Sequence, residues 1–534
     1  MIPADGRWLV LASSLLLGCT SDAAKSPSGS GGASVATNAG GTTSATGGTR
    51  AGGDTSTAQN RGGSTGAGGV AVPGSGGASG ADAAQAGTSG SGGMPNTGSG
   101  PDGGGTHASG GGAGASGKVG AGGSANSGGT GAATSTGGAT RTGGTGGDAT
   151  PDGGAGLGAA FPFPQNVKGS HCVLPTSYDN EKVRTAYQQW KEATITSDGA
   201  GTFQRVKKPD SGTVIGSSVS EGIGYGMILA VYLNDQSLFD NLWKYEQSHL
   251  DDNGLMNWEI GPDGKTTSGG SGAASDGDED MAWALVMADK QWGGKGSLAD
   301  TYLATAQKLI DLIWTYEVDQ SRGYMLKPGD QWGNVDITNP SYFAPAYYRV
   351  FGQVTGKASD WNKVIAGNYD ILEKSLNATS GNASNGLVPA WCNSSGTPVE
   401  AFSGSPKYFQ NDSTRMPFRV GQDFCYFAEP RAKSYLDKIT SFYVGVGVSK
   451  IVDGYDLNGT PHPDKATSGA QAASFVGPAG VGAMSDAKYQ SFLDGAYAAV
   501  ATLKLTAGTI YYQKSWTALS LLMMTGNLVD FTHR

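Results

Sequence analysis

The chain has 534 residues, a formal net charge of −9 and an unusually high content of glycine, with 90 residues. A mildly acidic balance argues against nucleic acid and anionic lipid surfaces as partners, because both attract clusters of positive charge. The CxxC and Cys/His spacings of a zinc site are absent, so we expect no metal centre.

Residues 1–19 contain a short apolar run, WLVLASSLLLGC, after Arg7. The run is too short to span a bilayer stably and is typical of a secretory signal peptide. Leu16–Cys19, LLGC, resembles a bacterial lipobox, which would place a lipid on Cys19 after cleavage. An ordinary signal peptide with an unrelated cysteine is the alternative. We therefore expect an exported protein, either a cell-envelope lipoprotein held at a membrane through Cys19 or a secreted one.

Residues 20–160 contain no Phe, Trp or Tyr and consist mostly of Gly, Ser, Thr and Ala. Such a segment cannot bury enough apolar surface to offset the entropy lost on ordering. We predict a disordered linker over this range.

Residues 161–534 hold all the Phe and Tyr of the chain and every Trp except Trp8. Apolar residues recur mainly at helical spacing, as in the segment that carries Leu303, Ala306, Ile310 and Ile313. We predict about eleven helices, over 180–193, 222–233, 236–249, 278–291, 303–317, 341–351, 361–375, 414–426, 431–445, 487–503 and 512–526. The clearest short strand is GTIYYQ, residues 508–513. The pattern favours a single all-α module with elaborate loops.

Three cysteines lie in this module: Cys172, Cys392 and Cys425. An exported protein permits a disulfide, but the pairing among three candidates cannot be read from the sequence.

Acidic residues gather where helices are expected to begin. Glu221 stands among glycines just before an apolar run, and we expect these glycines to leave room for helix and substrate to pack closely. Asp276 is followed three residues later by Glu279, as in a capping box, so helix capping is an alternative to a catalytic role. A calcium loop is disfavoured, because Met281 occupies the position where such a loop needs Gly.

A third cluster places Asp412 three residues before Arg415, in a segment rich in aromatic residues. Either the two form a surface salt bridge, or Asp412 is a buried carboxylate that needs Arg415 as its partner. Trp258 and Trp332 lie in loops flanked by glycine rather than on apolar helical faces. Each is a candidate platform for a sugar ring, and the alternative is a Trp that packs its loop onto the core.

Four of these segments, taken in order, resemble glycoside hydrolase family 8: SEGIGYGM at 220–227, ASDGDEDMAWAL at 274–285, NPSYFAPAYYRVF at 339–351 and NDSTRMPFRVGQDF at 411–424. The resemblance runs from about Phe163 to the C-terminus. It implies an (α/α)6 barrel over 161–534, with six inner and six outer helices. It also implies inverting hydrolysis of a β-1,4-linked polysaccharide without a cofactor.

The resemblance also implies residue roles. Glu221 would be the general acid, Asp412 the general base, and Asp276 would hold and help distort the sugar at the point of cleavage. Tyr342 would position the attacking water, and Arg415 would orient Asp412. Trp258 and Trp332 would stack on sugar rings.

An endo-β-1,4-glucanase, inverting and monomeric, is the function these features favour. An endoxylanase or a chitosanase of the same family is the alternative within enzymes, although Asp412 argues against a chitosanase. A non-catalytic glycan-binding surface lipoprotein is the alternative of another class.

Overall fold

The computed structural model describes residues 158–212, 214–463, 471–505 and 507–534. The predicted signal peptide, with Cys19, and the predicted linker up to residue 157 lie outside the described residues.

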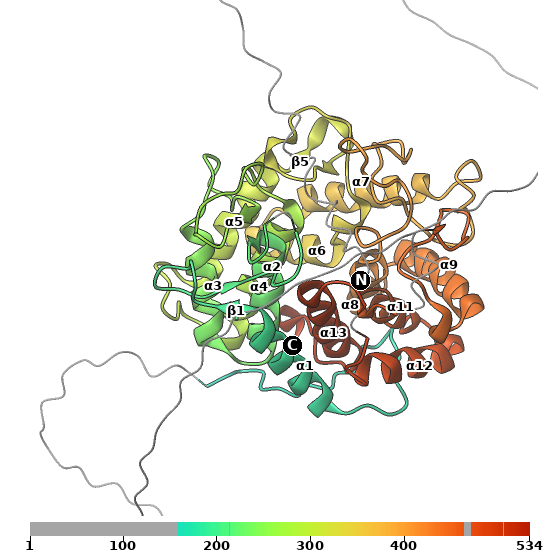
Figure 1. Ribbon diagram of the computed structural model, residues 1–534, viewed down its shortest axis with the longest axis horizontal. Helices are drawn as coiled ribbons and strands as arrows, with labels where there is room; N and C mark the ends of the chain where they lie inside the picture. Colours follow the sequence, from blue (N-terminus) through green and yellow to red (C-terminus); the bar gives the residue numbers. More distant parts are fainter. Residues whose placement is uncertain (1–157, 213, 464–470, 506) are drawn as a thin grey trace, which may run out of the picture. The chain divides into compact units, whose positions relative to one another are not determined.

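Within these ranges, twelve α-helices alternate along the chain between an outer and an inner layer (Figure 1). The outer helices are α1 (Asn180–Thr194), α3 (Gln236–Gln247), α5 (Tyr302–Tyr316), α7 (Ala358–Ser375), α9 (Pro430–Val446) and α12 (Gln490–Ala501). The inner helices are α2 (Ser220–Tyr232), α4 (Ser275–Trp292), α6 (Pro345–Thr355), α8 (Met416–Phe427), α11 (Ala473–Ala483) and α13 (Ile510–Met524). Each inner helix packs on the next, and α13 returns to α2, so the ring closes. The predicted (α/α)6 barrel is confirmed.

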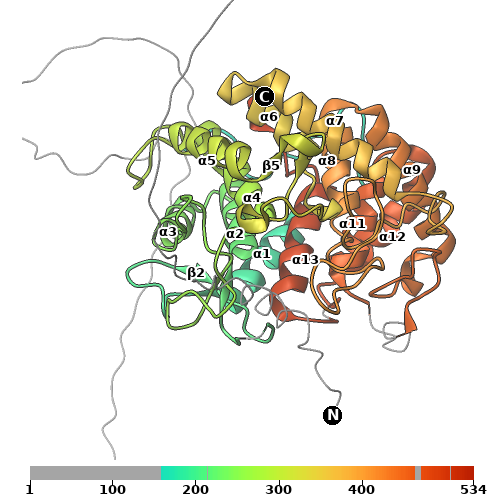
Figure 2. The same ribbon diagram turned by 90° about the horizontal axis from the view of Figure 1, so that it is seen from above.

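Burial separates the two layers. Every residue of α11 is buried, as is nearly every residue of α2 and α4, because neighbours surround an inner helix on all sides. An outer helix buries one face only: in α5, Tyr302, Ala306, Leu309, Ile310 and Ile313 face the core at helical spacing. Figure 2 shows α3 and α5 on the outside of α2 and α4.

In the part of the chain that the structure describes, strands are confined to three two-stranded antiparallel ribbons. They pair β1 (Ile195–Thr196) with β2 (Arg205–Val206), β3 (Ser218–Val219) with β4 (Glu259–Ile260), and β5 (Val318–Asp319) with β6 (Met325–Leu326). Short 3-10 helices are η2 (Gln320–Arg322), η3 (Asp330–Trp332), η4 (Pro340–Tyr342), η5 (Val448–Lys450), η6 (Ala487–Tyr489) and η7 (Phe531–His533). None of the described helices combines the length and the apolar character that a bilayer crossing requires.

Two predictions of secondary structure are wrong. The segment 508–513 forms no strand, because α13 begins at Ile510 and the barrel wall overrides the β-propensity of its Ile and Tyr residues. Helix α11 was not among the predicted helices, because it contains Pro478 and three glycines. An added Cβ at Gly477 would lie 2.2 Å from the Ser520 hydroxyl oxygen on α13, so small residues are needed for the two helices to approach.

The glycines after Glu221 serve contacts within the protein rather than room for substrate. An added Cβ at Gly224 would lie 2.7 Å from the Cβ of Asp280 on α4, and one at Gly222 would lie 3.0 Å from the Tyr511 ring on α13. The expectation of close helix packing is confirmed, and protein atoms occupy the space. The glycines thereby hold the start of α2 against the starts of its two neighbours.

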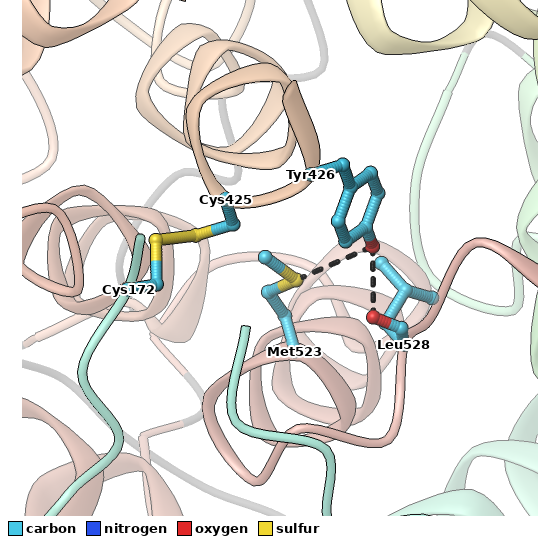
Figure 3. Close-up of a disulfide and its surroundings, with 5 residues drawn as sticks. All are labelled: Cys172, Cys425, Tyr426, Met523 and Leu528. Carbon is cyan, nitrogen blue, oxygen red and sulfur yellow. Dashed lines mark hydrogen bonds between the residues drawn. A yellow bond between two sulfur atoms is a disulfide. The ribbon is translucent and has the colours of Figure 1, made fainter. Parts of the chain in front are cut away.

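A disulfide joins Cys172, in the extended segment before α1, to Cys425 near the end of α8 (Figure 3). Beside it, the Tyr426 hydroxyl donates a hydrogen bond to the Leu528 carbonyl at 2.8 Å. Cys392 is a buried free thiol. The structure therefore resolves the pairing that the sequence left open.

Candidate active site

All six inner helices begin at the same end of the barrel, because helices that alternate with outer ones along the chain run in a common direction. Glu221 and Asp276 are the second residues of α2 and α4. Asp412 and Arg415 come just before α8, and Tyr342 ends η4, shortly before α6. The folded ring thus gathers five of the predicted site residues from segments up to 194 positions apart.

The guanidinium group of Arg415 lies at the centre of this group, and its side chain is 1% exposed. Its Nη1 donates to Glu221 Oε2 at 2.7 Å and to Asp276 Oδ2 at 2.5 Å, while Nη2 lies 3.6 Å from Asp412 Oδ1. Arg415 therefore contacts Glu221 and Asp276 more closely than Asp412, which it was expected to orient. Asp412 is instead held by Gln410, whose Nε2 donates to Asp412 Oδ2 at 2.7 Å.

One cation faces three carboxyl groups, so a negative charge on one of them is repelled by the others. The pKa of Glu221 is raised to about 7: burial raises it most, the charges of Asp276 and Asp412 also raise it, and Arg415 and Tyr511 lower it. Two acids with different environments can therefore hold different protonation states near neutral pH. Glu221 is suited to carry a proton at neutral pH.

Asp412 is the most open of the three carboxyl groups, with 38% of its side chain exposed against 19% for Glu221 and 4% for Asp276. Burial by its surroundings raises the pKa of Asp412, while Arg415 and Gln410 lower it. An exposed carboxylate can accept a proton from a water molecule, which the enclosed Asp276 is less placed to do.

Asp276 does not cap its helix in the predicted manner. The N-cap of α4 is Ala274, which makes no side-chain hydrogen bond. Asp276 Oδ1 accepts from the Gly277 amide at 3.0 Å, and its other oxygen binds Arg415. Glu279 accepts from the Tyr348 hydroxyl at 2.6 Å instead of returning to the helix start, so the capping box is absent.

The neighbouring acids of α4 face the protein interior. Asp280 forms a bidentate ion pair with Arg419 of α8, at 2.5 and 2.9 Å. Among the described residues, no group of three or more His, Cys, Asp or Glu side chains has an arrangement that could hold a metal ion.

Tyr342 and Trp332 belong to one aromatic cluster beside the carboxyl groups. The Arg415 guanidinium lies 4.8 Å from the centre of the Tyr342 ring. Tyr342 meets the Trp391 ring edge to face at 6.3 Å, and Trp391 stacks on Trp332 at 5.9 Å. The Trp332 side chain is partly exposed, whereas Trp391 is buried.

Trp258 comes directly before β4 and is hydrogen-bonded to the first residue of α2. Its carbonyl oxygen accepts a hydrogen bond from the Ser220 amide at 3.0 Å, and its indole N–H donates to the Gly269 carbonyl at 2.8 Å. The indole is partly buried, so both predicted sugar platforms are partly exposed and lie near the carboxyl groups.

Sequence reasoning missed Tyr511 and Trp391. The Tyr511 hydroxyl donates to Glu221 Oε1 at 2.6 Å from the second position of α13. Tyr511 was missed because residues 508–513 were predicted as a strand, whereas α13 already begins at Ile510. Trp391 stands between Ala390 and Cys392 in a loop, without the flanking glycines that pointed to Trp258 and Trp332.

Comparison with known proteins agrees with this geometry. The model of glycosyl hydrolases family 8 matches residues 170–526. Endoglucanase A of Acetivibrio thermocellus is 41% identical over 361 residues, which cover 66% of this chain and 72% of that protein. Endoglucanase 2 of Ruminiclostridium josui is 38% identical over 69% of this chain and 77% of that protein.

The apo structure of a beta-1,3-1,4-glucanase from a Paenibacillus species superposes with a TM-score of 0.61 at 30% identity, covering 69% of this chain and 98% of that one. The family match, over residues 170–526, includes the twelve described helices and all four motifs. The chain therefore belongs to glycosyl hydrolases family 8.

Proposed function

We propose that the protein is an endo-β-1,4-glucanase that hydrolyses its substrate with inversion of configuration. Support for the substrate comes from relatives named endoglucanase at 37–41% identity over most of the barrel. Support for the chemistry comes from one observation above all: three carboxyl groups converge on Arg415, and one of them, Glu221, is largely enclosed and has a pKa raised to about 7.

In this mechanism, Glu221 donates its proton to the glycosidic oxygen as the bond breaks. Asp412 removes a proton from a water molecule that attacks the anomeric carbon from the other face of the ring. Asp276, fixed by Arg415, binds hydroxyl groups of the sugar at the point of cleavage and favours a distorted ring. Tyr342 holds the attacking water beside Asp412.

The spacing of the acids is compatible with inversion. Arg415 lies 2.7 Å from Glu221 and 3.6 Å from Asp412 through the two ends of one planar guanidinium. The facing oxygens of the two acids are therefore no more than roughly 9 Å apart, and inverting glycosidases hold their acids about 6.5–9.5 Å apart. This upper bound admits the inverting separation, and the anomeric form of the first product distinguishes it from the about 5–5.5 Å of a retaining pair.

Substrate contacts are assigned to the two aromatic groups that flank the acids. Trp258 and Trp332 stack on sugar rings, and Trp391 supports Trp332 from behind. Because Trp258 and Trp332 stand on separate loops, we assign them to different sugar rings of a long chain, which suits endo action.

Substrate choice is tested with carboxymethylcellulose, mixed-linkage β-1,3-1,4-glucan, xylan and chitosan. We expect the fastest release of reducing ends from the two glucans, with an early fall in viscosity that marks endo cleavage. Faster action on xylan would favour the endoxylanase. No release from any of the four would favour the non-catalytic glycan-binding protein.

Stereochemistry tests the mechanism. Proton NMR of the first product from a β-linked oligosaccharide is expected to give the α-anomer, and Glu221→Gln is expected to lose roughly 10²–10⁴-fold in rate while binding survives. A β-anomeric first product contradicts the assignment of Asp412 as the base.

Export to the cell envelope, with a lipid on Cys19 as the membrane anchor, completes the proposal. The Cys172–Cys425 disulfide supports export, since disulfides persist mainly outside the reducing cytoplasm. Cys19→Ser is expected to release the protein from the membrane fraction, or leave it uncleaved, with its hydrolytic rate unchanged. Membrane association that persists in the variant contradicts the anchor.

A further inference from the structure

The start of α2 is fixed by a short ribbon rather than by helix contacts alone. Strand β3 pairs with β4 so that Val219 faces Glu259, and β3 leads directly into α2. The Ser220 amide donates to the Trp258 carbonyl at 3.0 Å. Glu221 is therefore one residue away from the last hydrogen bond of this ribbon.

A buried ion pair lies beneath the ribbon. Lys208 Nζ donates to Glu259 Oε1 at 2.7 Å, and the two side chains are 4% and 3% exposed. The Ser217 hydroxyl donates to the same oxygen at 3.0 Å, and the Thr267 hydroxyl donates to Oε2 at 2.9 Å. The Glu259 carboxylate thus joins three separate segments of the chain.

Lys208 is itself tied to the strand that precedes Glu221. Its amide donates to the Ser217 carbonyl at 2.8 Å, and its carbonyl accepts from the Gly216 amide at 2.8 Å. Nearby, Arg205 Nη1 donates to the Ser218 hydroxyl at 2.9 Å. Gly216, Ser217 and Ser218 are thereby each hydrogen-bonded to the segment 205–208.

The buried Lys208–Glu259 pair is not explained by its contribution to stability. Burying both charges costs desolvation energy that largely cancels their attraction, and an apolar pair of similar size is often as stable. Directional bonds do what an apolar pair cannot: they fix the register of a ribbon only two residues long. A slip of one residue would turn every side chain of β3 to the other face and carry Glu221 with it.

We infer that the buried Lys208–Glu259 pair positions Glu221 to donate its proton to the leaving group. Both are positioning residues that act through the ribbon, and the inference rests on the proposed role of Glu221 as general acid. A displacement of about 1 Å at a reacting group costs on the order of 10²-fold in rate. Loosening the ribbon is therefore expected to slow the steps that need a proton donor.

Leaving-group dependence tests this role. A β-cellooligosaccharyl fluoride releases fluoride with little need for protonation, whereas a β-1,4-glucan must have its glycosidic oxygen protonated. Glu259→Gln is expected to lower kcat on the glucan about 10- to 100-fold and to change kcat on the fluoride less than about 3-fold. Equal losses on both substrates, or no loss on either, overturn the inference.

A double variant distinguishes a positioning role from a loss of activity caused by unfolding. Lys208→Met combined with Glu259→Leu removes both charges and keeps an apolar pair of similar volume, so the barrel is expected to fold. The glucan rate is expected to stay low and the fluoride rate to stay near normal. A folded double variant with a normal glucan rate overturns the inference.

Two reference variants complete the experiment. Asp423→Asn breaks another ion pair, between the buried Asp423, two turns into α8, and the partly exposed Arg349. It is expected to lower thermal stability without any dependence on the leaving group, and selective loss on the glucan in this variant counts against the inference. Glu221→Gln is expected to lose the glucan rate and keep the fluoride rate; if it does not, the proposed role of Glu221 itself fails.

Discussion

Removing the Tyr511 hydroxyl is expected to shift the alkaline limb of the pH profile upward. Glu221 must be protonated to act as an acid, so the rate falls as the pH passes its pKa of about 7. The Tyr511 hydroxyl donates to Glu221 Oε1 at 2.6 Å and stabilises the ionised form, which lowers this pKa. In Tyr511→Phe the pKa of Glu221 therefore rises, and the enzyme stays active to higher pH.

The size of the shift follows from the bond. A hydrogen bond to a charged group contributes about 1.5–3 kcal/mol, and one pKa unit corresponds to about 1.4 kcal/mol, so the full effect is about 1–2 units. Water can replace part of the bond, because 19% of the Glu221 side chain is exposed. We expect the lower end, a shift of about one unit.

The assay is kcat/KM on a soluble cello-oligosaccharide from pH 4 to pH 10. Tyr512→Phe is the matched control, since the Tyr512 hydroxyl donates to the Asn411 carbonyl at 2.9 Å and not to Glu221. Its alkaline limb is expected to stay in place. A limb in Tyr511→Phe that stays fixed or moves to lower pH refutes the reasoning.

Three further outcomes are expected. Asp276→Asn is expected to lower kcat by at least tenfold, whereas near-normal turnover with about 1 kcal/mol less stability would return Asp276 to a structural role. Replacing Cys172 and Cys425 with Ser is expected to lower the free energy of unfolding by about 2–5 kcal/mol, measured by denaturant titration, because the bond closes a loop of 253 residues; an unchanged midpoint would contradict this. Burial raises the pKa of Glu246 from 4.5 to about 8, so between these values the folded chain holds a proton that the unfolded chain has released, and stability falls as pH rises. Glu246→Gln is therefore expected to raise the melting temperature more at pH 8.5 than at pH 5, and an equal change at both would refute the pKa.

The sequence alone was sufficient for the class of fold and for most of the site. Helical spacing predicted eleven of the twelve described helices within a few residues, because an outer helix must alternate apolar and polar faces to cover a core. The four ordered motifs located Glu221, Asp276, Tyr342, Asp412 and Arg415, and the barrel brings these five together.

Features that depend on packing between distant segments escaped the sequence. Helix α11 has too many glycines and a proline for its propensity to indicate a helix, and only its place between α8 and α13 makes those residues favourable. The choice of Cys425 over Cys392 as the partner of Cys172 likewise depends on which thiol the folded α8 presents to the N-terminal segment.

At the site, too, some properties are determined by the sequence and others only by the tertiary structure. Residue type and local motif determine that Glu221 is an acid at the start of an apolar helix. Its pKa of about 7 is decided by burial and by Asp276, Asp412, Arg415 and Tyr511, which come from three other inner helices or the residues just before them. These groups come together only when the ring of helices closes. Their electrostatic interactions depend on distances in space and on the exclusion of water, and the order of residues along the chain determines neither directly.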